Sequence, residues 1–112
     1  MPTLIEDTIA AISTPIGKSG VGVIRLSGQD SRKITESVFY SAQQTLQDHT
    51  PVLGNIQSSQ SEPVLDEAVV TYFREPRSFT REDVVEISCH GSPVVLKAVL
   101  NLLIEKGARM AT

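Results

Sequence analysis

Residues 20–28 read GVGVIRLSG, and residues 84–91 read VVEISCHG. In both stretches neighbouring side chains differ in character, and this two-residue period is typical of a β-strand, whose successive side chains point to opposite faces. Both strands look apolar enough to be buried, yet each carries one charge near its middle, Arg25 in the first and Glu86 in the second. The two stretches therefore predict a β-sheet with two unusual charged positions.

The alternation also assigns faces. One face of the first strand holds Val21, Val23, Arg25 and Ser27, and one face of the second holds Val84, Glu86, Ser88 and His90. Burying an unpaired charge is costly, so Arg25 and Glu86 each need a partner if they are buried. They could pair with each other, lie on a solvated sheet face, or bind a ligand. An arginine can donate hydrogen bonds from two N–H groups to a carboxylate or carbonyl. A carboxylate can accept two hydrogen bonds from neighbouring N–H groups, such as those on the amidine-like edge of a pterin.

Two helices are predicted. Ser92 and Pro93 provide an N-cap with proline at the first helical position, and Gly107 follows the end of a helix over residues 93–106. Its wide apolar stripe consists of Val94, Val95, Ala98, Val99, Leu102 and Leu103. A shorter helix is expected over about residues 30–38, after several N-cap candidates.

Further strands are expected at residues 8–12, 52–57 and 65–73, and one more begins at residues 109–112. The order β, β, α, β, β, β, α, β indicates an α+β domain, in which two main helices cover a mixed β-sheet. Residues 1–112 fall within the usual size of one compact domain.

Composition excludes several classes of function. The formal net charge of −3 argues against nucleic-acid binding by this domain's own electrostatics, because phosphate contacts draw on clustered Lys and Arg. The longest apolar stretches fall short of the roughly 20 residues that a membrane span needs, and the N-terminus lacks a signal sequence. The single cysteine, Cys89, cannot form an internal disulfide. We therefore expect a cytoplasmic protein.

Other motifs favour structural interpretations. The sequence Gly17-Lys18-Ser19 suggests a phosphate-binding loop, but Ile12 stands where the first glycine of that motif belongs. The two histidines, His49 and His90, lack metal-ligand spacing, so no metal site is predicted.

Single side chains in the second strand and the loop before it also have structural interpretations. His90 is expected to form a hydrogen bond to the backbone or to a ligand at a strand end, and Cys89 to be a small core residue. Glu82 and Asp83 are interpreted as solvated loop residues or local caps rather than as an acid–base pair. No catalytic residue is predicted in this chain.

Four blocks in order carry a resemblance to a known family: residues 7–15, residues 20–28, residues 78–91 and residues 107–111. Together they resemble the N-terminal domain of the MnmE (TrmE) family of tRNA-modification GTPases. The resemblance implies a fold related to the folate-binding part of glycine-cleavage aminomethyltransferases. It also implies a homodimer that binds a tetrahydrofolate derivative, in the 5-formyl or 5,10-methylene form.

For the whole protein, the resemblance implies further parts outside these residues: a helical domain and a GTPase domain that uses GTP, Mg and K. With the flavoprotein MnmG (GidA), such a protein modifies C5 of the wobble uridine of certain tRNAs with a one-carbon unit from folate. The alternative is a purely structural dimerisation or protein-interaction module without folate binding.

The family's folate-contacting arginine and glutamate fall on Arg25 and Glu86, the two strand charges already singled out. Two positions depart from the family's pattern. Arg81 stands where most members have glycine, which matters if the loop needs a positive φ. Ser92 replaces a second glycine and is acceptable there as a helix N-cap.

Overall fold

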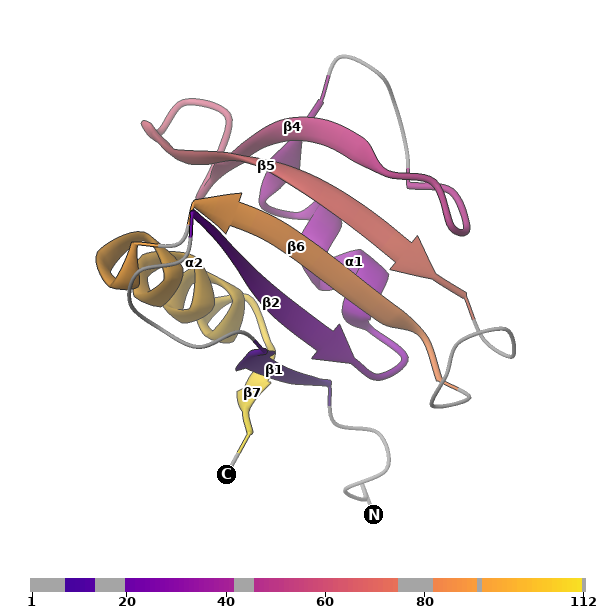
Figure 1. The fold of residues 1–112 in the computed structure, drawn as a ribbon. Helices are drawn as coiled ribbons and strands as arrows, with labels where there is room; N and C mark the ends of the chain where they lie inside the picture. Colours follow the sequence, from indigo (N-terminus) through magenta and orange to yellow (C-terminus); the bar gives the residue numbers. More distant parts are fainter. Residues whose placement is uncertain (1–7, 14–19, 42–45, 75–81, 91, 112) are drawn as a thin grey trace.

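A computed structural model describes residues 8–13, 20–41, 46–74, 82–90 and 92–111 of the chain. These residues form one mixed sheet with two helices (Figure 1). In chain order the elements are β1 Ile9–Ile12, β2 Val21–Ser27, α1 Ser31–Glu36, β3 Phe39–Tyr40, β4 Val52–Gln57, β5 Val64–Phe73, β6 Val84–His90, α2 Pro93–Glu105 and β7 Arg109–Met110. The α+β prediction is confirmed.

The strands lie in the order β3-β4-β5-β6-β2-β1-β7. All neighbours in this sheet are antiparallel except β1 and β7, which are parallel. The central pair is β2 and β6, the two strands with a charge near their middle, and its register places Arg25 opposite Glu86. On the other side of β6, Thr71 of β5 is also opposite Glu86. Segments distant in sequence thus form one polar row across the sheet.

The largest differences from the sequence prediction lie at α1 and β3. Helix α1 is shorter than residues 30–38, because the backbone N–H of Val38 bonds to the carbonyl of Thr35 at 3.0 Å and the chain then enters β3. Strand β3 was not predicted at all. It exists because Phe39 and Tyr40 pair with Ile56 and Asn55 of β4, a partnership that two residues of local sequence do not reveal.

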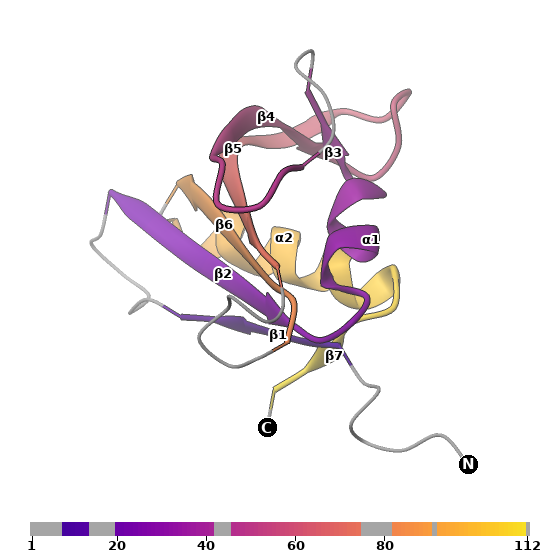
Figure 2. The ribbon, with the colours of Figure 1, turned by 90° about the vertical axis from the view of Figure 1, so that its right-hand side faces the viewer.

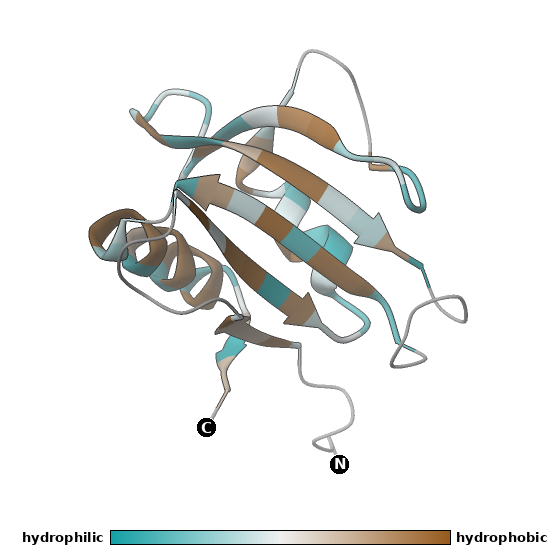
Figure 3. Ribbon diagram, in the orientation of Figure 1, coloured by the Kyte–Doolittle hydropathy of each residue, from teal (hydrophilic) through white to brown (hydrophobic). Residues whose placement is uncertain are grey.

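Both helices cover the same face of the sheet, as Figure 2 shows. The core between them includes Ile24, Leu26 and Ile87 from the sheet and Leu96 and Leu103 from α2. Burial of this apolar layer is the main source of stability in such a domain. The strands in Figure 3 are banded by hydropathy along their length, as expected when only one sheet face is covered.

A glycine allows α2 to approach the sheet. A Cβ atom on Gly22 would lie 2.6 Å from Cδ2 of Leu96, which is closer than side chains pack. Within the described residues, neither helix is long and apolar enough to cross a membrane.

Candidate functional site

The face of the sheet without helices is the candidate site, and we call it the open face. Arg25, Glu86 and Thr71 form a row across its middle, and all three are half-buried. The composition of β2 and β6 suggested that both strands are buried. The structure shows that they are buried on one face only. Because Arg25 and Glu86 lie on the open face, water can solvate their charges and neither charge needs a buried partner.

Arg25 and Glu86 are neighbours without being an ion pair. Among the described residues, neither side chain has a hydrogen bond or a charged partner within 4.0 Å. The sequence analysis left open whether these two charges pair with each other or lie on a solvated sheet face. In the structure they lie on a partly solvated sheet face and do not pair. Their guanidinium and carboxylate groups thus remain available on one surface.

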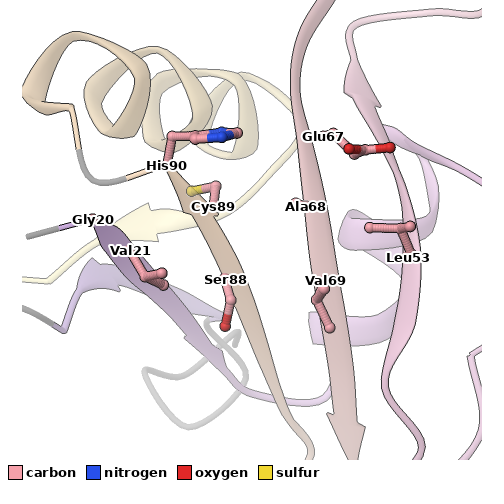
Figure 4. Close-up of a pocket in the computed structure, with 9 residues that line it drawn as sticks. All are labelled: Gly20, Val21, Leu53, Glu67, Ala68, Val69, Ser88, Cys89 and His90. Atoms are coloured by element: carbon pink, nitrogen blue, oxygen red, sulfur yellow. The ribbon is translucent and has the colours of Figure 1, made fainter.

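Farther along the same face lies a shallow hollow of about 230 Å³ (Figure 4). Its lining comprises Gly20, Val21, Leu53, Glu67, Ala68, Val69, Ser88, Cys89 and His90. Val21 and Leu53 are 57% and 55% exposed, which is unusual for large apolar side chains on a sheet. The hollow contains neither Arg25 nor Glu86, so the open face has two neighbouring parts: a polar row and a largely apolar hollow.

His90 and Asp66 form a tight pair at the end of the hollow. Nδ1 of His90 lies 2.6 Å from Oδ1 of Asp66, and the backbone N–H of His90 donates to Oδ2 at 2.9 Å. The Asp66 side chain is only 9% exposed, whereas that of His90 is 70% exposed. The prediction that His90 binds the backbone or a ligand missed this partner, because Asp66 lies on a different strand.

The Asp66 carboxylate replaces a strand-to-strand hydrogen bond at the point where the pairing of β5 with β6 ends. That register runs from Phe73 opposite Val84 to Val69 opposite Ser88. Beyond Ser88, the backbone N–H of His90 is held by the Asp66 side chain. The residues on either side of this point, Val69 from β5 and Ser88 from β6, line the hollow.

Of the two interpretations of Glu82 and Asp83, solvated loop residues or local caps, the first is wrong, because both side chains make specific hydrogen bonds. The hydroxyl of Ser27 donates to Oε2 of Glu82 at 3.1 Å, and the hydroxyl of Tyr72 donates to Oδ2 of Asp83 at 3.1 Å. The Asp83 carbonyl also accepts the backbone N–H of Gly28 at 2.9 Å. The two carboxylates thus connect the start of β6 to β2 and β5 by hydrogen bonds, which is a structural role.

Cys89 is a small core residue, as the sequence analysis predicted. Cys89 is buried on the face opposite His90, and burial raises the pKa of its thiol to about 11, with the Asp66 charge acting in the same direction. A thiol of this kind is a poor nucleophile at neutral pH. Within the described part of the chain, no group of three or more His, Cys, Asp or Glu residues could hold a metal ion.

Two predictions lie outside the described residues, namely those for Gly17-Lys18-Ser19 and for Arg81. Ser92 does precede α2, with Pro93 at the first helical position, but its side chain makes no capping hydrogen bond.

This fold defines a small α+β domain with one helix-covered and one open sheet face. The model of the family described as "GTP-binding protein TrmE N-terminus" matches residues 8–112, and the chain belongs to this family. Proteins described as "tRNA modification GTPase MnmE" are similar to it. The one from Lactobacillus helveticus is 50% identical over 97% of this chain, and the one from Acetivibrio thermocellus is 49% identical over 95%. The one from Cytophaga hutchinsonii is 52% identical over 94%.

The chain spans about a quarter of the length of these relatives, which is 24%, 24% and 23% respectively. The resemblance inferred from four sequence blocks is thereby confirmed at the level of the family.

Proposed function

We propose that this chain is the folate-binding and homodimer-forming domain of a tRNA-modification GTPase. The observation that supports folate binding most directly is the position of Arg25 opposite Glu86 on the open face, without an ion pair between them. Glu86 can accept two N–H bonds from the 2-amino and N3–H edge of a pterin. Arg25 can donate to a carbonyl or carboxylate of the same ligand. The donors and acceptors present thus fit a tetrahydrofolate derivative, in the 5-formyl or 5,10-methylene form.

Within the whole protein, the domain would serve chemistry carried out elsewhere. A GTPase domain would supply the GTP, Mg and K sites, and the flavoprotein MnmG would be the partner in modifying C5 of the wobble uridine of certain tRNAs. The folate held here would supply the one-carbon unit, in the cytoplasm. This chain would bind and orient its ligand without a catalytic residue of its own.

Titration with 5-formyltetrahydrofolate tests folate binding. Loss of a charged hydrogen-bonding group costs about 1.5–3 kcal/mol, so Arg25→Met and Glu86→Gln should each weaken binding by roughly 10- to 100-fold. Glu62→Gln, an exposed change in the β4–β5 turn, is the matched control and should leave the affinity unchanged. Absence of binding to the unmodified protein in a confirmed dimer would overturn the proposal.

The homodimer is supported by the uncovered apolar side chains of the open face. Val21, Leu53 and Val69 are all exposed, and a second copy packed beside the bound folate would remove from water the apolar surface that the ligand leaves uncovered. Sedimentation analysis should therefore give the mass of two chains, and Leu53→Asp should shift it to one. Val94→Asp, at a 77% exposed position on α2, is the control and should not dissociate the dimer. A monomer at all concentrations would contradict this part.

The same apolar side chains favour the second candidate function, a purely structural dimerisation or interaction module. Under that alternative, the Leu53→Asp result would be the same. However, neither Arg25→Met nor Glu86→Gln would alter any ligand response, because there would be none.

A further inference from the structure

The contact between His90 and Asp66 determines whether the exposed Nε2 atom of His90 donates or accepts a hydrogen bond. An ionised carboxylate can only accept hydrogen bonds, so the 2.6 Å contact to Asp66 Oδ1 places the proton of the neutral ring on Nδ1. Nε2 then carries the lone pair and is an acceptor. Because the second oxygen of Asp66 is held by the backbone N–H of His90 at 2.9 Å, the carboxylate cannot turn away easily.

Nε2 has no hydrogen bond to any described residue. In Figure 4 the ring of His90 projects from β6 toward β5, at one end of the hollow. The other polar side chains that line the hollow, Ser88 and Glu67, can also accept hydrogen bonds, and its described lining contains no Lys or Arg. Its apolar side chains can contact the faces of a ring. The hollow therefore suits a flat, largely apolar ring that carries N–H donors.

The hollow and the polar row lie side by side along β6, so one long ligand could occupy both. Glu86, Ser88 and His90 alternate onto the same face of β6, and at about 3.3 Å per residue Glu86 and His90 lie roughly 13 Å apart. A ligand with its pterin at Glu86 and its long axis along β6 would place its next ring over the hollow. In a folate that ring is the p-aminobenzoyl group, which has an N–H on each side in the 5-formyl form and the glutamyl amide N–H alone in the 5,10-methylene form.

We propose that the hollow holds the p-aminobenzoyl ring of the folate, and that Nε2 of His90 accepts a hydrogen bond from an N–H of the ligand beside that ring. This inference rests on the proposed function, since it adds a second part to the same binding site. Asp66 is a positioning residue that acts through His90, because it sets which nitrogen of the ring is the acceptor.

The test compares dissociation constants for 5-formyltetrahydrofolate among the unmodified protein, His90→Phe and Asp66→Asn. The side-chain amide introduced by Asp66→Asn can offer Nδ1 an N–H donor, which moves the ring proton to Nε2 and turns that atom into a donor. Both variants should bind about 3- to 10-fold more weakly, as expected for one hydrogen bond. The control is His49→Phe, since His49 makes a similar contact to Asp48 at 2.7 Å but does not line the hollow.

A conservative variant separates a ligand contact from a structural role. In His90→Gln the side-chain amide oxygen can accept the same hydrogen bond from the ligand, although the contact of the ring with Asp66 is lost. His90→Gln should therefore bind 5-formyltetrahydrofolate more tightly than His90→Phe does.

Two outcomes would overturn the inference by itself. In the first, Glu86→Gln loses binding while His90→Phe keeps the affinity of the unmodified protein. In the second, His90→Gln binds no more tightly than His90→Phe does, although both variants are folded. If the unmodified protein binds no folate, the proposed function fails and this inference fails with it.

Discussion

The two faces of β2 and β6 differ in what holds their side chains in place. On the covered face, Ile24, Leu26 and Ile87 are fully buried against the helices. On the open face, Val21 is 57% exposed and Arg25 is half-buried. The same strands therefore build a close-packed layer and, on the other side, a surface with free polar groups and a hollow. A change on one face should affect stability, whereas a change on the other should affect binding.

The sharpest test of this difference replaces neighbouring apolar residues of β2. Ile24→Ala removes a fully buried side chain and should lower the free energy of unfolding by about 3 kcal/mol. Val21→Ala, on the open face, should lower it by less than about 0.5 kcal/mol. Urea denaturation measures both, at a protein concentration low enough for the chain to be monomeric. Similar losses in the two variants would show that the open face is packed within one chain.

Two glycines give the next comparison. On Gly22, an added methyl group would meet Leu96 at 2.6 Å, so Gly22→Ala should cost about 1–3 kcal/mol through overpacking. On Gly20, an added methyl group meets nothing within 4 Å, and Gly20→Ala should be within about 0.5 kcal/mol of the unmodified protein. The measurement is again urea denaturation. A neutral Gly22→Ala would mean that α2 can move outward without cost.

Alkaline pH should act through the covered face. Burial raises the pKa of Cys89 from 9.0 to about 11, and burial, with the neighbouring Asp83 charge, also raises the pKa of Tyr72. The folded state thus favours the neutral thiol, so this stabilisation is complete below pH 9.0 and is lost as the pH rises toward 11. Ionisation of the Cys89 thiol alone should reduce the free energy of unfolding by about 1 kcal/mol at pH 10.

The control for this pH effect is Cys89→Ala, in which the loss between pH 8 and pH 10 should be smaller by that amount. An identical loss in both proteins would assign the alkaline effect to other groups.

The smallest expected effect comes from Thr35 of α1. This residue is fully buried, and among the described residues its hydroxyl has no hydrogen-bond partner. An unsatisfied buried hydroxyl is costly, so Thr35→Val, which keeps the shape, should stabilise the protein by about 1 kcal/mol. Thr71→Val, on the half-buried open face, should change little. Thermal unfolding would compare the two, and a less stable Thr35→Val would indicate that the hydroxyl does have a partner.

Much of the fold could be predicted because it depends on local patterns. The two-residue alternation located β2 and β6 to within a residue or two and assigned their faces correctly, and the apolar stripe located α2. Strand β3 and the early end of α1 could not be predicted, because both depend on pairing with β4. The candidate site was predicted in part. Arg25 and Glu86 were identified as charges in apolar strands, but the hollow was missed, since its side chains come from four separate segments.

By itself, the sequence determined the α+β class, the faces of the central strands and the family, because periodicity and motifs are properties of the chain itself. Only the tertiary structure decided that Arg25 is opposite Glu86, that helices leave their face uncovered, and that Asp66 holds His90. These relations depend on which strands become neighbours and in which register. Many distant contacts together set strand order and register, and no local pattern encodes them.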